Sequence, residues 1–115
     1  MNGFIFDEKL EEKISYIRES LKNKASEYAP LNSDRFSNFE KAAIISGEPT
    51  EQMMFNFMLK HFVSYMDMLY DCKYKANAKW DATYIKEKFG DIINYFILSE
   101  IYFLENRSKP LIEDE

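Results

Sequence analysis

Cysteine, glycine and proline are scarce in this chain. Of its 115 residues, one is cysteine, three are glycine and three are proline. The single cysteine, Cys72, excludes an internal disulfide and a multi-cysteine zinc site, and it fits a reducing cytosol. Three glycines cannot build a phosphate-binding loop, and so few turn residues argue against a multi-stranded sheet. With one histidine and one cysteine, the sequence does not suggest a protease-like catalytic triad.

Positive charge and long apolar runs are also lacking. The net charge is −5 and there is no basic stripe, so binding to nucleic acid is not expected. The opening MNGFIFDEKL lacks the basic region and apolar run of a signal peptide. The longest apolar runs are interrupted at Asn94, Ser99 and Glu100, so no segment is expected to span a bilayer. We therefore expect a cytoplasmic protein, in the host cell if the chain is encoded by a phage.

Aromatic side chains are abundant instead. The chain has 8 tyrosines and 10 phenylalanines, and aromatic residues make up 17% of the sequence. A domain of this length buries about two-thirds of the surface that its unfolded chain exposes. Some of the aromatic area is therefore expected to face a ligand or a second copy, and we predict a homo-oligomer. Residues 1–115 are expected to form one domain, with a frayed acidic tail at about 107–115.

Apolar residues recur at helical spacing in four segments, which predicts an all-α domain of four helices. The two later segments are apolar on more than one side, as expected for helices that a partner also covers. The predicted helices are 8–28 with Asp7 as N-cap, 34–46 stopped by Gly47, 51–71, and a last helix from the cap Asp81 to about Asn106.

A line of polar residues runs along the apolar last helix. Glu87, Asp91 and Asn94 are spaced i, i+4, i+7, so they share one side of the helix. A buried, unpaired carboxylate costs several kcal/mol, so these groups are expected to reach water, pair, or hold a ligand. Lys60 opposite Glu87 or Asp91 would be the neutralising pair. Gly90, which is costly inside a helix, indicates the close approach of another helix or a ligand.

A second polar line runs along the third predicted helix. It consists of Asn56, Lys60, Ser64 and Asp67, and His61 lies beside it. The alternative interpretation is that each line is the solvated stripe of its helix, and that His61 is a hydrogen-bonded structural histidine. The chemistry that the two lines allow is based on carboxylates, such as a Mg²⁺ ion that engages a phosphate-bearing ligand.

Four short segments carry a family resemblance. They are KASEYA (24–29), DRFSNF (34–39), MLKHFVSYMDML (58–69) and EKFGDIINYFIL (87–98). In this order they resemble small phage and prophage proteins of the nucleotide-modification-associated, MazG-like family, over roughly residues 24 to 105. The resemblance implies an all-α fold, frequent oligomerisation, a phage setting and a link to nucleotides. Characterised MazG-like enzymes hydrolyse nucleoside triphosphates with Mg²⁺ held by acid pairs on two helices.

The acidic motifs of that family are only partly present. Asp91 matches the aspartate of the second motif, Lys88 replaces its glutamate, and Glu87 lies one residue earlier. Paired glutamates of the first motif are missing. The resemblance therefore implies at most one weak Mg²⁺ site, at Glu87 and Asp91, and it favours binding over efficient turnover.

Three functions follow from the residues and the resemblance together. The favoured one is a phage-encoded protein that binds a nucleotide or phosphate-bearing ligand and sequesters it, for example a host defence signal. The alternatives are a protein-interaction module that inhibits a host defence protein, and a degenerate Mg²⁺-dependent nucleoside-triphosphate pyrophosphohydrolase. The residues predicted to line the ligand pocket are Lys60, His61, Asp67, Asp91, Asn94, Tyr95, Tyr28, Arg35 and Asn38.

Overall fold

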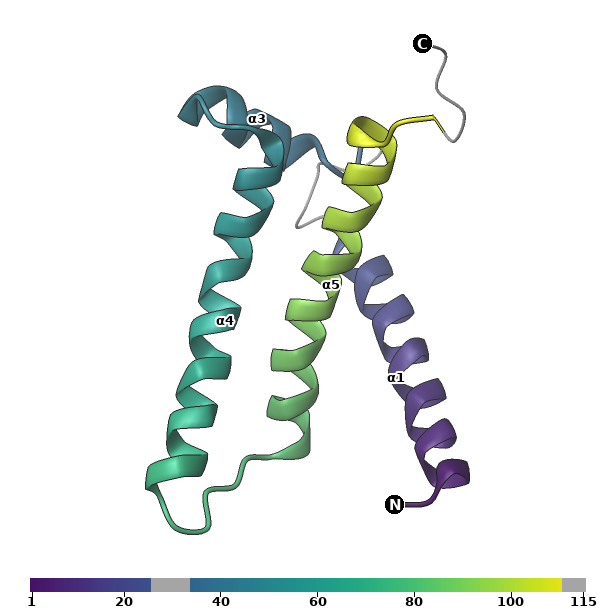
Figure 1. The fold of residues 1–115 in the computed structure, drawn as a ribbon, viewed down its shortest axis with the longest axis vertical. Coiled ribbons are helices and arrows are strands. Elements are labelled where there is room, and N and C mark those ends of the chain that lie inside the picture. The colour runs from purple at the N-terminus through teal and green to yellow at the C-terminus, as the bar shows by residue number, and fades with distance from the viewer. Residues whose placement is uncertain (26–33, 111–115) are drawn as a thin grey trace.

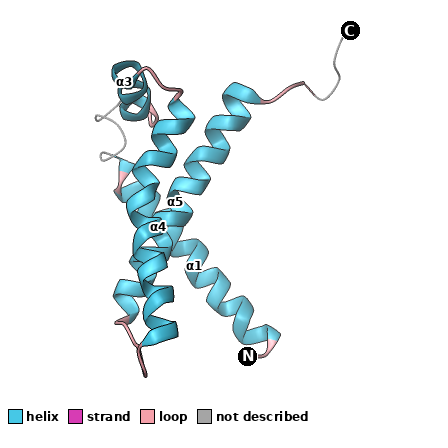
Figure 2. Ribbon diagram, turned by 60° about the vertical axis from the view of Figure 1, so that its left-hand side comes forward, coloured by secondary structure: helices cyan, strands magenta, loops and turns pink. Residues whose placement is uncertain are grey.

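The protein is all-helical, as predicted. A computed structural model describes residues 1–25 and 34–110, and these residues form four helices and no strand (Figure 1, Figure 2). None of these helices is both long enough and apolar enough to cross a bilayer. The helices are α1 (Gly3–Asn23), α3 (Ser37–Ser46), α4 (Thr50–Tyr74) and α5 (Ala82–Arg107).

Helix α5 lies between α4 and α1, and its packing against α4 is the most extensive contact between two helices (Figure 1). Helices α4 and α5 form an antiparallel hairpin, α3 packs on α4, and α1 packs on α5 (Figure 1). The N-terminal half of α1 runs away from the hairpin (Figure 2). The result is an elongated, open arrangement with extents of 54 × 35 × 34 Å.

Helix α1 begins earlier than the sequence pattern predicts. The predicted N-cap, Asp7, lies inside the helix, and the observed N-cap is Asn2. The Asn2 side chain accepts a hydrogen bond from the backbone N–H of Ile5 at 2.9 Å. Because this amide oxygen satisfies an otherwise unpaired donor, the apolar first turn can join the helix. The predicted end at residue 28 lies outside the described residues.

Helix α3 begins later than predicted. Asp34 lies in a turn that precedes it, where its carboxylate accepts a hydrogen bond from the backbone N–H of Phe36 at 2.7 Å. This local bond competes with the helix and delays its start to Ser37. The predicted stop at Gly47 is confirmed, since that residue has φ 69° and takes the left-handed C-cap conformation.

The hairpin helices have nearly the predicted bounds. Helix α4 continues to Tyr74, three residues past the predicted end, and α5 starts after the predicted cap Asp81. Arg107, where the tail is predicted to begin, is still helical, and its guanidinium pairs with the carboxylate of Glu51 on α4. This pair ties the C-terminal end of α5 to the start of α4.

The core is small and lies where α3 meets the hairpin. Its fully packed members come from α3, α4 and α5, and several of them are aromatic. Ring contacts hold it together, such as Phe39 with Phe57 at 5.2 Å and Phe36 with Tyr102 at 5.1 Å between centroids. Many large apolar side chains along the rest of the hairpin are exposed. The buried residues of this core cluster are Phe39, Met54, Leu98 and Tyr102.

Candidate functional site

Helix α1 crosses α5 at Gly90, which is buried. A Cβ atom placed on Gly90 would lie 2.8 Å from the ring atom Cε1 of Tyr16 on α1, closer than real side chains approach. The close approach that Gly90 indicates in the sequence is therefore that of another helix. Glycine at this position leaves room for the Tyr16 ring against the backbone of α5, and the crossing sets which side chains meet next to it.

A group of five polar side chains from three helices lies beside this crossing. The Nζ atom of Lys24, just past the end of α1, donates to the Asp91 carboxylate at 2.6 Å. His61 on α4 approaches the other carboxylate oxygen, with 3.5 Å between Nδ1 and Oδ2. The amide nitrogen of Asn94 donates to the hydroxyl of Ser20 at 2.9 Å. We call Ser20, Lys24, His61, Asp91 and Asn94 the polar junction.

Asn94 is the most deeply buried member of the polar junction. Its side chain is 0% exposed, yet its carbonyl oxygen Oδ1 has no hydrogen-bond partner among the described residues. An unpaired buried acceptor costs about 1–3 kcal/mol, so native proteins contain few of them. Such a buried acceptor calls for an explanation. The direct explanation is a hydrogen-bond donor that the described residues do not supply.

A cleft lined by three lysines opens next to the same crossing. It has a volume of about 430 Å³ and is lined by side chains of α1 and α5. The Lys13 ammonium donates to the backbone carbonyl of Lys86 at 3.2 Å and lies 4.6 Å from the centroid of the Tyr16 ring. Burial, with the nearby Lys86 charge, lowers the pKa of Lys13. We call this site, lined by Lys9, Glu12, Lys13, Tyr16 and Lys86, the lysine cleft.

The structure brings four of the predicted pocket residues together. His61, Asp91 and Asn94 belong to the polar junction, and the ring of Tyr95 lies 5.6 Å from the imidazole of His61, tilted by 33°. Three of these residues come from one turn of α5 and the fourth from the facing turn of α4. Asp91 and Asn94 are three residues apart and lie on one side of α5, as helical spacing predicts.

The other predicted pocket residues do not join this group. Lys60 and Asp67 are exposed on α4, and Asn38 is half-buried in α3. Arg35 is exposed, and its guanidinium donates to a backbone carbonyl near the end of α1 at 3.3 Å. Tyr28 lies outside the described residues.

The predicted pair between Lys60 and an acid of α5 is wrong. Asp91 pairs with Lys24 instead, because the polar side of α4 that carries Lys60 does not face α5. Sequence reasoning also missed Ser20. The sequence contains a signal for Ser20, because it lies four residues before Lys24 and therefore on the same side of α1 as that residue. Lys24 in turn opens one of the segments that carry the family resemblance.

The predicted Mg²⁺ site has little support in the arrangement of its acids. Glu87 is exposed, and Asp91 is already neutralised by Lys24. Within residues 1–25 and 34–110, no three His, Cys, Asp or Glu side chains are grouped so that they could hold a metal ion. The acids of the described residues do not make the shared cluster that a two-ion phosphohydrolase site requires.

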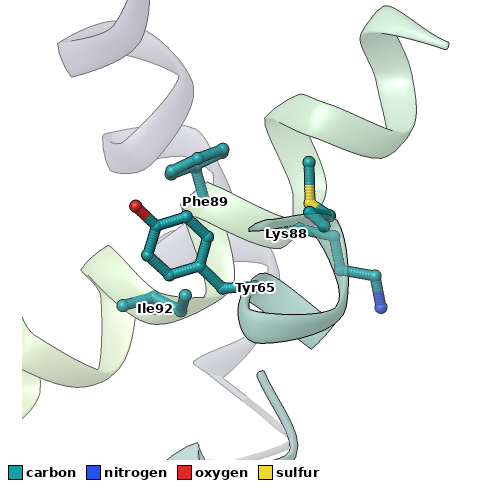
Figure 3. A pocket seen from close by; sticks show the side chains of 5 residues that line it. Tyr65, Lys88, Phe89 and Ile92 are labelled. Atoms are coloured by element: carbon teal, nitrogen blue, oxygen red, sulfur yellow. The ribbon is translucent and has the colours of Figure 1, made fainter. Parts of the chain in front are cut away.

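A second small hollow, between α4 and α5, is apolar. The rings of Tyr65 and Phe89 meet edge to face with 5.3 Å between centroids, and the lining leaves no space for a water molecule. Figure 3 shows Phe89, Tyr65 and Ile92 gathered together, with the Lys88 ammonium directed away from them. This hollow is part of the packing seam of the hairpin and offers no polar group to a ligand.

Burial lowers the pKa of His61 below its ordinary value, and the charges of Lys60, Lys88 and Lys24 lower it further, against the opposing effect of Asp91. The unfolded chain therefore binds a proton at this residue more readily than the folded chain does. Stability from this group is complete above the unfolded pKa of about 6.5 and is lost as the pH falls through the folded pKa.

His61→Gln is expected to flatten the dependence of stability on pH. Because the chain has one histidine, the comparison isolates that group. Between pH 7.5 and about 5, wild type should lose more unfolding free energy than the variant, since its unfolded state gains the extra proton. Urea unfolding at each pH measures this difference. A wild-type protein that becomes more stable than the variant on acidification would contradict the assignment.

Comparisons with known proteins add no assignment to this site. No family model, no curated protein and no solved structure matches the chain. The candidate site therefore rests on its own geometry, which is a buried polar junction beside a cleft of lysines.

Proposed function

We propose that this protein, which resembles small phage-encoded MazG-like proteins, binds a nucleotide or similar phosphate-bearing ligand in the cytoplasm without efficient turnover. The observation that carries the proposal is the buried, unpartnered Oδ1 atom of Asn94. An N–H or O–H group of a base or sugar would satisfy it. Natural proteins contain few such costly acceptors, and a functional role is one reason for keeping them.

Positive groups near the polar junction supply the partner for phosphate. Lys24 lies within it, and Lys13 and Lys86 meet in the adjacent lysine cleft. In a chain with net charge −5, this gathering of cations is local. Charge-assisted hydrogen bonds from ammonium groups to phosphate oxygens are strong, and the neighbouring rings of His61 and Tyr95 provide aromatic surface nearby.

Binding is favoured over hydrolysis by the arrangement of the acids. Hydrolysis of a triphosphate with two Mg²⁺ ions requires several free carboxylates that face one another. Here the Asp91 carboxylate is held by Lys24 and approached by His61, while Glu87 points to solvent. The proposed ligand is therefore held and sequestered. Asn94 is closed off from solvent, so entry requires α1 to move relative to α5, the described helix on which it packs.

The proposal is tested by a thermal-shift screen with nucleotides and cyclic dinucleotides. At least one of these compounds is expected to raise the melting temperature of the wild-type protein. The same compound should leave the melting temperature of Asn94→Leu unchanged. Leucine keeps the branched skeleton of the side chain and removes the Oδ1 acceptor that the ligand would use. A ligand at about 100 times its Kd stabilises the folded state by about 2.7 kcal/mol, which a thermal-shift screen detects readily.

Asn56→Leu is the matched control for this screen. Asn56 is an exposed asparagine of α4, bonded to Gln52 at 2.9 Å and away from the polar junction. That variant should respond to the ligand as wild type does. If no compound raises the wild-type melting temperature, or if Asn94→Leu responds fully, the proposed site is wrong.

We further propose that the protein works as a homo-oligomer. Large apolar side chains are exposed on α1, α4 and α5, among them Phe4 at 75% and Met66 at 65%. Extensive contiguous apolar surface of this kind marks an interaction site in a water-exposed protein.

A protein-interaction module is the second candidate, and the outer face of α1 favours it. Asp7, Glu8, Glu11 and Glu12 follow the exposed Phe4 on one side of this helix. An acidic surface with an aromatic at one end suits a basic protein partner. Binding of such a partner that survives Asn94→Leu but not Phe4→Ala would favour this function over ligand binding.

A further inference from the structure

The chain exposes more surface than a compact monomer of its size. Its accessible surface is 8943 Å², whereas a folded monomer of 13.7 kDa exposes about 6,600 Å². Its radius of gyration is 17.5 Å, against about 13 Å for a compact chain of this length. The surplus of about 2,300 Å² exceeds the about 800 Å² that each partner contributes to a standard interface.

An exposed apolar stripe runs along α4. Its members recur at steps of three and four residues, so they share one side of the helix, and each is between 41% and 65% exposed. This side differs from the one that packs on α5 and from the polar side that carries Lys60. The members are Phe55, Leu59, Val63, Met66 and Tyr70.

A matching stripe runs along α5. Ile85, Phe89, Phe96 and Phe103 lie on one side of this helix and are between 36% and 53% exposed. The two stripes are adjacent, because Phe96 meets Phe62 of α4 edge to face with 5.8 Å between ring centroids. Together they form one apolar surface two helices wide, which we call the hairpin face.

The hairpin face is on the side of α5 that α1 leaves open. Helix α1 packs on α5 at Gly90 and Asn94. Asn94 and Phe96 are two residues apart, which places their side chains on nearly opposite sides of a helix. The polar junction and the hairpin face therefore occupy different sides of the same helix.

We infer that the hairpin face packs against the same face of a second copy, related by a two-fold axis, so that two hairpins form a four-helix core. This inference deepens the proposed homo-oligomer by naming its interface, and it does not depend on ligand binding. The residues of both stripes are uncharged, so self-association through them brings no like charges of this acidic chain together. A two-fold contact needs only a self-complementary patch.

Light scattering coupled to gel filtration tests the interface. Wild type should have twice the chain mass of 13.7 kDa, and both Met66→Glu and Phe96→Glu should have the mass of one chain. A buried, unpaired carboxylate on each copy opposes the contact. Met66 is 65% exposed and Phe96 is 53% exposed, so neither change removes a core side chain of the single chain.

Ile45→Glu on α3 is the matched control, since Ile45 is 86% exposed and lies outside the hairpin face. It should remain a dimer. A monomeric wild type would overturn both the interface and the homo-oligomer, whereas a dimeric Met66→Glu with native helicity would overturn the interface alone. If Phe96→Glu loses its helical circular dichroism, Met66→Glu decides. The ligand-binding proposal is tested separately by the rise in melting temperature, because the polar junction lies on another side of α5.

Discussion

Asn94→Asp is expected to destabilise the folded protein by about 3–5 kcal/mol at neutral pH, the usual cost of an uncompensated buried charge. Asn94 is 0% exposed, and its Oδ1 atom has no partner among the described residues. The substitution places a carboxylate there, one turn from Asp91. Lys24 is already bonded to Asp91, so no free cation in the polar junction neutralises the new charge. Urea unfolding measures the loss.

The control for this prediction is Asn94→Leu. It removes the unpaired acceptor and keeps the branched skeleton of the side chain, while the Ser20 hydroxyl can turn to a backbone carbonyl of its own helix. Its unfolding free energy should stay within about 1 kcal/mol of wild type.

The destabilisation caused by Asn94→Asp should depend on pH. Burial would raise the pKa of the new aspartate, so the loss of unfolding free energy relative to wild type should be smaller at pH 5 than at pH 8. A penalty that grows on acidification would contradict this account.

Gly90→Val is expected to cost about 1–3 kcal/mol, because α1 must move away from α5 to make room for the side chain. Even a Cβ atom would lie 2.8 Å from Tyr16, and valine adds two methyl groups to it. The displacement would also stretch the bonds from Lys24 to Asp91 and from Asn94 to Ser20. Chemical unfolding and near-ultraviolet circular dichroism of the tyrosines both report it.

Gly3 provides the matched control, because a Cβ atom there would meet nothing within 4 Å. Gly3→Val should change the unfolding free energy by less than about 0.5 kcal/mol. Removing the opposing ring should relieve the clash, so Gly90→Val should cost less in a Tyr16→Ala background than in wild type. Equal costs in the two backgrounds would show that the crossing does not limit the side chain at this position.

Both substitutions act where α1 meets α5, and this contact links the fold to the proposed function. The described part of α1 is attached to the rest of the protein through α5. Movement of α1 would uncover Asn94 while the hairpin, and the face by which we infer that it dimerises, stay intact. Ligand entry and self-association therefore use opposite sides of one helix and can be measured independently.

Helix content was readable from local sequence. Each helix repeats apolar residues at its own period, and neighbouring residues such as Gly47 and Asp81 mark where a helix stops or starts. The errors at α1 and α3 have local causes as well. Asn2 captures a backbone donor that extends α1, and Asp34 captures one that shortens the start of α3. Short side-chain bonds of this type are weak signals in a sequence.

Only some residues of the candidate site could be predicted from the sequence. Asp91 and Asn94 stand out because polar residues at helical spacing on an apolar helix need partners. Their partners could not be read, since Lys24 and Ser20 are 67 and 74 residues away in the chain and nothing local ties them to α5. The sequence offered Lys60 as readily as Lys24. The choice between them depends on which side of α4 faces α5.

By itself, the sequence determined an all-α chain with a glycine and two polar side chains on an apolar helix, because helical periodicity is a property of consecutive residues. Tertiary structure alone decided that α1 crosses at Gly90, that Lys24 neutralises Asp91, and that Asn94 keeps an unpaired acceptor. Those outcomes depend on how whole helices pack, and packing is decided by shape and burial over the entire molecule.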